Sequence, residues 1–242
     1  MKTVQTVVGP LLMWDQDDIT KALEVPGHFW DVHLKQAMDD TPSDGWALDL
    51  GANVGFFSLY LAQRFDQVLA VEAHPATCEL LCRNVAANGT SKVLIVPGAA
   101  YDKHTILELA SSAVHQWPEA EQSFADLDKA FHPAGFSFVE DPTQMHPMHE
   151  VRIPTVLVDE LVPVDVMVRL IKIDVQGATL RALYGATKTI ARCRPRIIFE
   201  WEAYVSRCRG DDWPDYVQFF AEREYAISHL QGPTHDYLAV PM

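Results

Sequence analysis

The sequence predicts an α/β fold, doubly wound around a mostly parallel sheet, and two features of its patterning support this. From residue 46 onward, short apolar runs alternate with segments of helical composition at the spacing of right-handed parallel crossovers. The runs show little polar alternation, which is typical of strands buried on both faces of a sheet. The last two runs flank a turn-rich stretch at residues 231–235, so they predict an antiparallel hairpin at the end of the chain.

Each predicted element follows from its local composition. Several predicted strands end at glycine or at an acidic residue, and the helix from Pro75 stops at Asn88-Gly89. The expected strands are residues 46–50, 68–71, 93–96, 151–156, 166–173 and 196–200. The expected helices are residues 54–64, 75–87, 178–191 and 214–223, and the expected hairpin strands are residues 225–229 and 236–240.

The chain is predicted to consist of a cap segment and a main domain. Residues 1–45 lack the regular alternation, so we interpret them as an N-terminal cap that contains one helix at residues 28–38. Residues 46–242 form the main domain. Within it, residues 102–150 interrupt the alternation with four prolines and five histidines. Long irregular segments inside compact domains are often lids or binding loops, so we expect a lid-like insertion over the substrate.

Composition and charge exclude several classes of protein. Of the 242 residues, 48% are hydrophobic and 21% are charged, which excludes a mainly disordered chain. The formal net charge of −14 disfavours duplex nucleic acid and membrane surfaces as partners, because both select for Lys and Arg. No run approaches the roughly 18 apolar residues of a spanning helix. Four cysteines are too few for a disulfide scaffold, so we expect a cytoplasmic protein.

The sharpest motif lies between the first predicted strand of the main domain and the helix that follows. Its spacing is Asp-x-Gly-x-x-x-Gly, with Asp49, Gly51 and Gly55 at the fixed positions. Glycine permits a tight turn close to a ligand, and the helix start favours an anionic group such as a carboxylate. A dinucleotide fingerprint requires Gly-x-Gly-x-x-Gly, and Asp49 stands at its first glycine, so a nicotinamide oxidoreductase is disfavoured.

Two further acids stand at the ends of later strands. Glu72 comes 23 residues after Asp49, where an acid can accept both hydroxyls of a ribose, and Asp174 ends the strand at residues 166–173. Parallel strands place these acids along one carboxyl edge, where open α/β sheets bind ligands. A ligand with an amino acid at one end and a ribose at the other matches this edge. S-adenosylmethionine is such a molecule.

Several segments occur together in an order that points to one family. They are Leu48-Asp49-Leu50-Gly51-Ala52-Asn53-Val54-Gly55-Phe56-Phe57-Ser58, Val71-Glu72-Ala73-His74-Pro75, Asn84, Asn88-Gly89, Pro97-Gly98-Ala99-Ala100, Thr155-Val156-Leu157-Val158-Asp159-Glu160-Leu161, Ile171-Lys172-Ile173-Asp174-Val175-Gln176-Gly177-Ala178 and Phe199-Glu200. Through them the chain resembles the FkbM-type class I S-adenosylmethionine-dependent methyltransferases over residues 46–101 and 151–202. The resemblance implies a Rossmann-like sheet of seven strands and methyl transfer, often to a hydroxyl oxygen.

The resemblance also implies which residues hold the cofactor. Asp49, Gly51 and Asn53 would line its methionine part, and Glu72 would hold the ribose. Ala73 and His74 would flank the adenosine, and the backbone of residues 98–100 would lie near the adenine. Asp174 would lie near the methionine amino group or the acceptor. The full implied set is Asp49, Gly51, Ala52, Asn53, Gly55, Phe56, Glu72, Ala73, His74, Gly98, Ala99, Ala100, Asp174 and Gln176.

The residues leave the acceptor chemistry open. The family usually has Glu at the position of Gln176 and often at that of Thr179, so this chain lacks a carboxylate there. A general base, if one is used, is expected to be a histidine or carboxylate near the edge that holds Asp174. The candidate catalytic residues are Asp174, Glu200, His115 and His146. We expect no metal ion, since the His/Glu-containing loop at residues 146–150 gives no ligand geometry.

Three functions remain open. The first is an S-adenosylmethionine-dependent O-methyltransferase that acts on a hydroxyl of a small molecule or a sugar. The second has the same fold and cofactor but an amine, RNA or protein acceptor. The third is a degenerate methyltransferase fold that serves as a binding module, which Gln176 and Thr179 favour and the intact acids at the edge disfavour. The oligomeric state does not follow from the sequence.

Overall fold

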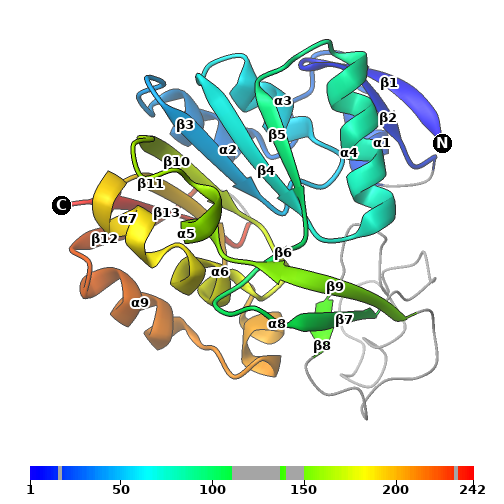
Figure 1. Cartoon of the computed structure of the whole chain (residues 1–242). Helices are drawn as coiled ribbons and strands as arrows, with labels where there is room; N and C mark the ends of the chain where they lie inside the picture. The colour runs from blue at the N-terminus through cyan, green and yellow to red at the C-terminus, as the bar shows by residue number, and fades with distance from the viewer. Residues whose placement is uncertain (16–17, 111–136, 140–149, 232–233) are drawn as a thin grey trace.

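A sheet of seven strands runs through the part of the chain that the computed structural model describes, which is residues 1–15, 18–110, 137–139, 150–231 and 234–242 (Figure 1). Its strand order is β12-β13-β11-β10-β3-β4-β5. The strands are β3 (Trp46–Leu50), β4 (Gln67–Glu72), β5 (Val93–Pro97), β10 (Val168–Ile173), β11 (Arg196–Glu200), β12 (Tyr225–His229) and β13 (Asp236–Pro241). Strands β11, β10, β3, β4 and β5 pair in parallel, and β13 is antiparallel to its two neighbours. The predicted sheet and terminal hairpin are confirmed.

Helices cover both faces of this sheet, which explains why its central strands are apolar throughout. Ala47 of β3 belongs to a buried cluster with α3 (Phe56–Ala62) and α4 (Pro75–Ala87). The next residue, Leu48, belongs to the opposite cluster, with α6 (Thr179–Gly185), α7 (Thr187–Cys193) and α9 (Trp213–Ala221). Successive side chains of a strand point to opposite faces, so the sheet is doubly wound.

The N-terminal 45 residues contain more structure than the single helix that their sequence predicts. They form the hairpin of β1 (Lys2–Thr6) and β2 (Gly9–Met13), then α1 (Asp18–Leu23) and α2 (Val32–Asp39). The hairpin lies beside α4 (Figure 1). There the Asn84 side chain accepts from the Leu12 amide at 2.6 Å and donates to the Leu12 and Val54 carbonyls at 3.1 and 2.8 Å. This segment therefore packs into the core of the main domain.

A second, smaller sheet follows β5. Its strands are β6 (Ala99–Ala100), β7 (Ile106–Ala110), β8 (Ser137–Val139) and β9 (Glu150–Val156), in the order β6-β9-β7-β8. Of these, the sequence predicts β9 alone. The β7 strand pairs antiparallel with β9 across a long stretch of chain, a relationship that local composition does not reveal. The role of residues 102–150 as a lid stays a prediction, because residues 111–136 and 140–149 lie outside the described ranges.

The helices differ from their predicted bounds at a few places. The predicted helix at residues 178–191 is two helices, α6 and α7, which meet at Ala186. Gly185 at the end of α6 lies so close to the Tyr101 carbonyl oxygen that a Cβ there would come within 2.0 Å of it. Two short helices, α5 (Val158–Leu161) and α8 (Ala203–Cys208), were not predicted. Within the described ranges, every helix is too short or too polar to cross a lipid bilayer.

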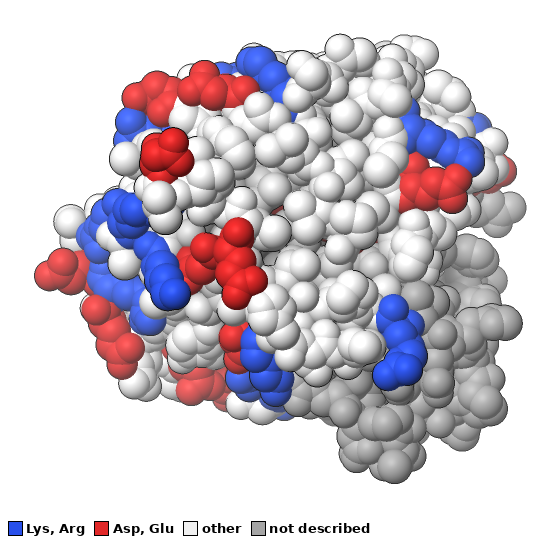
Figure 2. All heavy atoms as spheres, viewed as in Figure 1, with Lys and Arg blue, Asp and Glu red and all other residues white. Residues whose placement is uncertain are grey.

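Charged side chains of both signs are interspersed on the face that Figure 2 draws. The whole chain carries 33 acidic and 19 basic residues.

Candidate functional site

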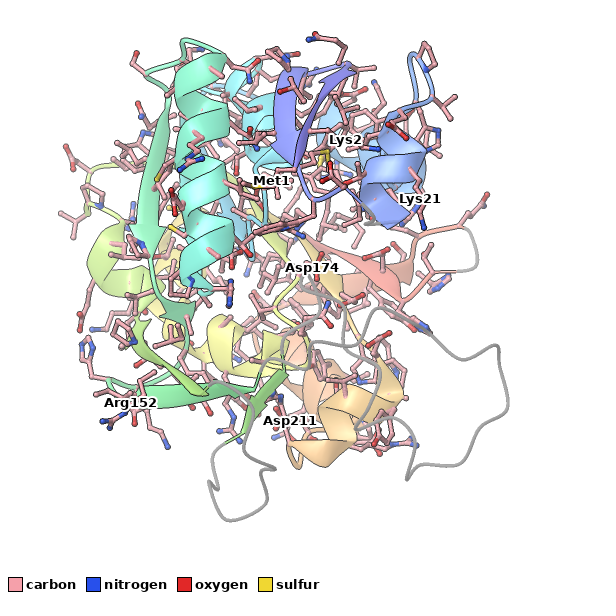
Figure 3. The ribbon with its side chains drawn as sticks, turned by 90° about the vertical axis from the view of Figure 1, so that its right-hand side faces the viewer. Met1, Lys2, Lys21, Arg152, Asp174 and Asp211 are labelled. Atoms are coloured by element: carbon pink, nitrogen blue, oxygen red, sulfur yellow. The ribbon has the colours of Figure 1, made fainter. Side chains whose placement is uncertain are left out.

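The three acids that the sequence singles out lie at the carboxyl ends of neighbouring strands. Asp49 is in β3, Glu72 ends β4, and Asp174 follows β10, with β3 between the other two strands. The amide of Asp174 donates to the Leu50 carbonyl oxygen at 2.9 Å, which joins the loops after β3 and β10. Figure 3 labels Asp174 near the centre of the molecule. The structure therefore brings these acids to one edge, as predicted.

The loop after β3 is shaped by glycine. Gly51 has a φ of +81°, and a Cβ added there would come within 1.8 Å of the Asp174 carbonyl oxygen. The amides of Gly51 and Ala52 both donate to the Val71 carbonyl oxygen, at 2.9 and 3.0 Å. Gly55 has a φ of +96° and lies against Leu81 of α4. The loop thus turns tightly and leaves its backbone close to the strand ends, as a loop that approaches a ligand must.

Glu72 is held by backbone amides from two directions. Its Oε2 accepts from the Asn53 amide and its Oε1 from the His74 amide, each at 2.8 Å. The side chain is 8% exposed, and its burial raises its pKa to about 7, although the two amides favour the charged form. Each carboxylate oxygen has further lone pairs, so the group can also accept from hydroxyls of a ligand.

A buried charge network lies beneath the edge. Asp49 has no exposed surface; its Oδ2 accepts from Ser58 Oγ at 2.6 Å, and its Oδ1 lies 3.4 Å from the ammonium of Lys172. The same ammonium lies 3.6 Å from Asp174 Oδ2 and 4.9 Å from the centre of the Phe57 ring. Burial raises the pKa of Asp49. Burial disfavours the charged form of Lys172, but the two carboxylates outweigh it and raise the pKa of the ammonium.

More acids surround the edge on the side away from β4. Glu200 at the end of β11 has its pKa raised well above the usual range by burial and then by the charges of Asp174 and Glu202. Strand register places Asp236 opposite Glu200. Asp31, which precedes α2, has its pKa raised to about 6 by burial and by Asp236. Candidate residue Glu200 therefore does lie near Asp174, in an acidic surrounding.

Sequence reasoning missed three members of this acidic group: Asp31, Glu202 and Asp236. Two of them carried a usable signal, because Glu202 follows a predicted strand end and Asp236 begins the predicted hairpin strand. Asp31 had no such signal in the sequence, because the fold of the N-terminal segment brings it to the edge. Its backbone is left-handed there, with a φ of +49°. Its neighbour His33 contacts Asp236 at 2.6 Å between Nε2 and Oδ2, which ties that segment to β13.

The remaining predicted cofactor residues occupy several places. The Gly98 amide donates to the Glu72 carbonyl oxygen at 2.9 Å, so residues 98–100 continue the same edge. His74 is the N-cap of α4. The Gln176 Nε2 lies 3.5 Å from Asp174 Oδ1. Phe56 is 4% exposed and packs on Phe29, with ring centres 5.0 Å apart, so its ring lies in the core.

Two candidate catalytic residues, His115 and His146, lie outside the described residues. Over the described part of the chain, no three or more His, Cys, Asp and Glu side chains are grouped so as to hold a metal ion. The chemistry visible at the edge is therefore that of carboxylates, backbone amides and one buried ammonium.

Comparison with protein families matches residues 49–227 to the family described as "Methyltransferase FkbM domain". The chain belongs to the FkbM methyltransferase family. The match begins at Asp49 and includes the three acids of the edge as well as Glu200. The family assignment made from the sequence is confirmed.

Two curated relatives have names that contain the word methyltransferase. "Methyltransferase 1" of Beauveria bassiana (strain ARSEF 2860) is 28% identical over 158 residues, which are 60% of this FkbM-family chain and 59% of that protein. "Methyltransferase sdnD" of Sordaria araneosa is 43% identical over 49 residues, 19% of each chain. The chain thus spans 59% and 19% of the lengths of these curated relatives.

Among solved structures, methyltransferase FkbM from Methylobacillus flagellatus KT superposes with a TM-score of 0.50 at 17% sequence identity. The superposition covers 82% of this chain and 44% of that one. At this identity the likeness concerns the fold alone, and it agrees with the Rossmann-like sheet described above.

Proposed function

We propose that this FkbM-family chain is an S-adenosylmethionine-dependent methyltransferase that methylates a hydroxyl of a small molecule or a sugar. One observation carries the cofactor part of the proposal. The carboxylate of Glu72, fixed by two amides, lies on the same edge as the tight Gly51 loop and the partly exposed carboxylate of Asp174. That order of groups suits a ligand with a ribose, a sulfonium centre and an amino acid.

The residues of the edge fit this cofactor in shape and in charge. Gly51 has no room for a side chain, so at this position the loop after β3 presents only backbone. Glu72 has lone pairs for the two ribose hydroxyls. The side chain of Asp174 is 41% exposed and can accept from an α-ammonium group, whereas Asp49 is enclosed. Direct contact of Asp49 with the cofactor stays a prediction.

The protein has two tasks in the transfer: to orient an acceptor and to remove its proton. Bound S-adenosylmethionine supplies an activated methyl group on a sulfonium. The edge holds the acceptor oxygen in line with that methyl and excludes water from it. Glu200 is a described candidate for the base, because it ends β11 close to Asp174 and because burial raises its pKa, which makes its ionised form a stronger proton acceptor. Asp174 is the alternative described candidate.

The acids around Glu200 bear on the kind of acceptor. Asp31, Glu202 and Asp236 add negative charge beside it, which disfavours a phosphate-rich acceptor such as RNA. A neutral hydroxyl fits this surrounding. An amine acceptor is a second candidate, which the same acids favour because it is a cation when protonated.

The first experiment measures binding of S-adenosylhomocysteine by calorimetry, with NADH as the control ligand. We expect micromolar binding, about 8 kcal/mol, that Glu72→Ala abolishes and that the exposed-site variant Glu79→Ala leaves unchanged. Absence of binding of either ligand would instead favour a binding module without this cofactor. Binding of NADH alone would contradict the interpretation of the glycine spacing.

The second experiment tests the base, on a panel of phenols, sugars and amines with labelled cofactor. Glu200→Ala, Asp174→Ala, His115→Ala and His146→Ala are compared for turnover at equal cofactor occupancy. We expect Glu200→Ala to lower turnover by a factor of about 100 or more with a hydroxyl acceptor. Unchanged turnover in all four variants would contradict general-base catalysis by these residues.

A further inference from the structure

Lys172 occupies an unusual place for a lysine, inside a central strand and between two acids. It is 3% exposed, and strand register pairs it with Asp49 of β3. Its ammonium contacts two carboxylates of unequal exposure: Asp49 is fully buried, and 41% of the Asp174 side chain is exposed. The three groups thus form a row from the core to the edge: inner carboxylate, ammonium, outer carboxylate.

The inner part of this row is fixed. A buried ammonium is costly unless it is paired, and Asp49 provides the balancing charge. The second oxygen of Asp49 is held by Ser58 at 2.6 Å, and the Phe57 ring covers the ammonium from another side. The Lys172 ammonium is therefore a permanent cation at a set position below the edge.

The outer part of the row faces the candidate site. Asp174 Oδ2 lies 3.6 Å from the ammonium, and Oδ1 lies 3.5 Å from Gln176 Nε2. The loop that carries Asp174 is anchored to β3 by its backbone amide. Two described side chains, Lys172 and Gln176, thus contact this carboxylate, and of the two only Lys172 carries a charge.

We propose that Lys172 is a positioning residue for the amino-acid part of the cofactor. It orients the Asp174 carboxylate so that an oxygen points to the α-ammonium group, and Asp49 acts by balancing the charge of Lys172 rather than by touching the ligand. This inference rests on the function proposed above.

The test compares two ligands that differ only in the part concerned. S-adenosylhomocysteine carries the amino acid, and 5′-methylthioadenosine keeps the adenosine and the sulfur but lacks it. Lys172→Met retains the apolar stem and removes the charge. We expect it to weaken S-adenosylhomocysteine at least about tenfold while 5′-methylthioadenosine stays within about twofold of the parent.

Two double variants separate positioning from mere structural support. Asp49→Asn with Lys172→Met removes both members of the buried pair, so no unpaired charge remains in the core. Positioning predicts that S-adenosylhomocysteine still binds weakly, because Asp174 still lacks its partner. Lys172→Met added to Asp174→Asn should cause no further loss, since the two side chains act as one unit.

Each outcome decides the question. Parental affinity for S-adenosylhomocysteine in Lys172→Met, or its return in the Asp49→Asn double variant, would overturn the positioning role and leave the proposed function standing. A parent protein that binds neither ligand would overturn the proposed function and this inference together. Where Lys172→Met alone does not fold, the double variant is compared with Asp49→Asn alone. Positioning predicts that Lys172→Met lowers the affinity for S-adenosylhomocysteine further in that background, and equal affinities would overturn the positioning role.

Discussion

Gly51 and Asp174 are in direct backbone contact: a Cβ on Gly51 would lie 1.8 Å from the Asp174 carbonyl oxygen. The contact joins the loop after β3 to the loop after β10, so the two halves of the edge hold a common shape. A substitution at Gly51 therefore acts on both loops at once. It is the most direct way to change the shape of the edge without changing any charge.

We expect Gly51→Ala to destabilise the protein by about 2 to 4 kcal/mol, from the collision and from its φ of +81°. Binding of S-adenosylhomocysteine should fall at least about tenfold. The matched control is Gly89→Ala, which has a φ of +64° but no atom within 4 Å of the added Cβ. Urea unfolding and calorimetry on both variants make the comparison. Equal losses in the two variants would mean that backbone strain, not the contact with Asp174, is responsible.

The raised pKa of Glu72 leads us to expect that cofactor binding depends on pH. Its pKa is raised to about 7 by burial, and ribose hydroxyls donate to the ionised carboxylate. Binding therefore selects the ionised form, so affinity should rise as pH increases from about 5.5 to about 7.5 and then level off. Calorimetry near pH 6.5 should also detect release of a proton. Glu72→Gln should bind weakly with a flat profile over this range, and a parent profile as flat as that of the variant would contradict the assignment.

The Asn84 side chain of α4 is expected to contribute strongly to holding the hairpin of β1 and β2 against the main domain. The side chain is 1% exposed and makes three hydrogen bonds, to both backbone groups of Leu12 and to the Val54 carbonyl. Asn84→Ala should lower the free energy of unfolding by about 2 to 4 kcal/mol, since it leaves buried backbone groups without partners. Asn88→Ala, which removes a side-chain bond to the Pro10 carbonyl at 2.8 Å, should cost about 1 kcal/mol. Urea unfolding distinguishes the two.

Removal of the Asp31 charge is expected to stabilise the folded protein at neutral pH. Its pKa is raised to about 6, so its ionisation destabilises the folded state as pH rises from about 4 to about 6. Asp31→Asn should therefore add about 1 to 2 kcal/mol at pH 7.5 and nothing at pH 3.5, and Asn tolerates the left-handed backbone there. Thermal unfolding at the two pH values checks the sign. The exposed Asp66→Asn is the control, and a gain of equal size in it would argue against burial as the cause.

The sheet was predictable because its signals are local. An apolar run such as β4, followed by a helix with Pro75 at its start and Asn88-Gly89 at its end, has few alternative structures. The hairpin of β1 and β2 was not predicted, because its two-residue turn is Val7-Val8, which lacks the Asn-Gly or Gly-containing pattern typical of such turns. The pairing of β7 with β9 is non-local, and tertiary contacts of this kind leave little trace in composition.

The candidate site was predictable to the extent that it lies at strand ends. Asp49, Glu72 and Asp174 could be placed on one edge from strand order alone. What strand order does not give is depth. Asp49 is enclosed beside Lys172 while Asp174 reaches the surface, and this difference arises from side-chain packing around Ser58 and Phe57.

The double use of the Val71 carbonyl has a thermodynamic consequence. This one oxygen accepts from the amides of Gly51 and Ala52, and the next residue, Asn53, donates to Glu72. Three successive amides of the loop are thus already engaged in the free protein. The loop has therefore lost conformational entropy during folding, and a ligand that binds there does not have to order the loop again. We therefore expect this loop to keep its conformation when a ligand binds at the edge.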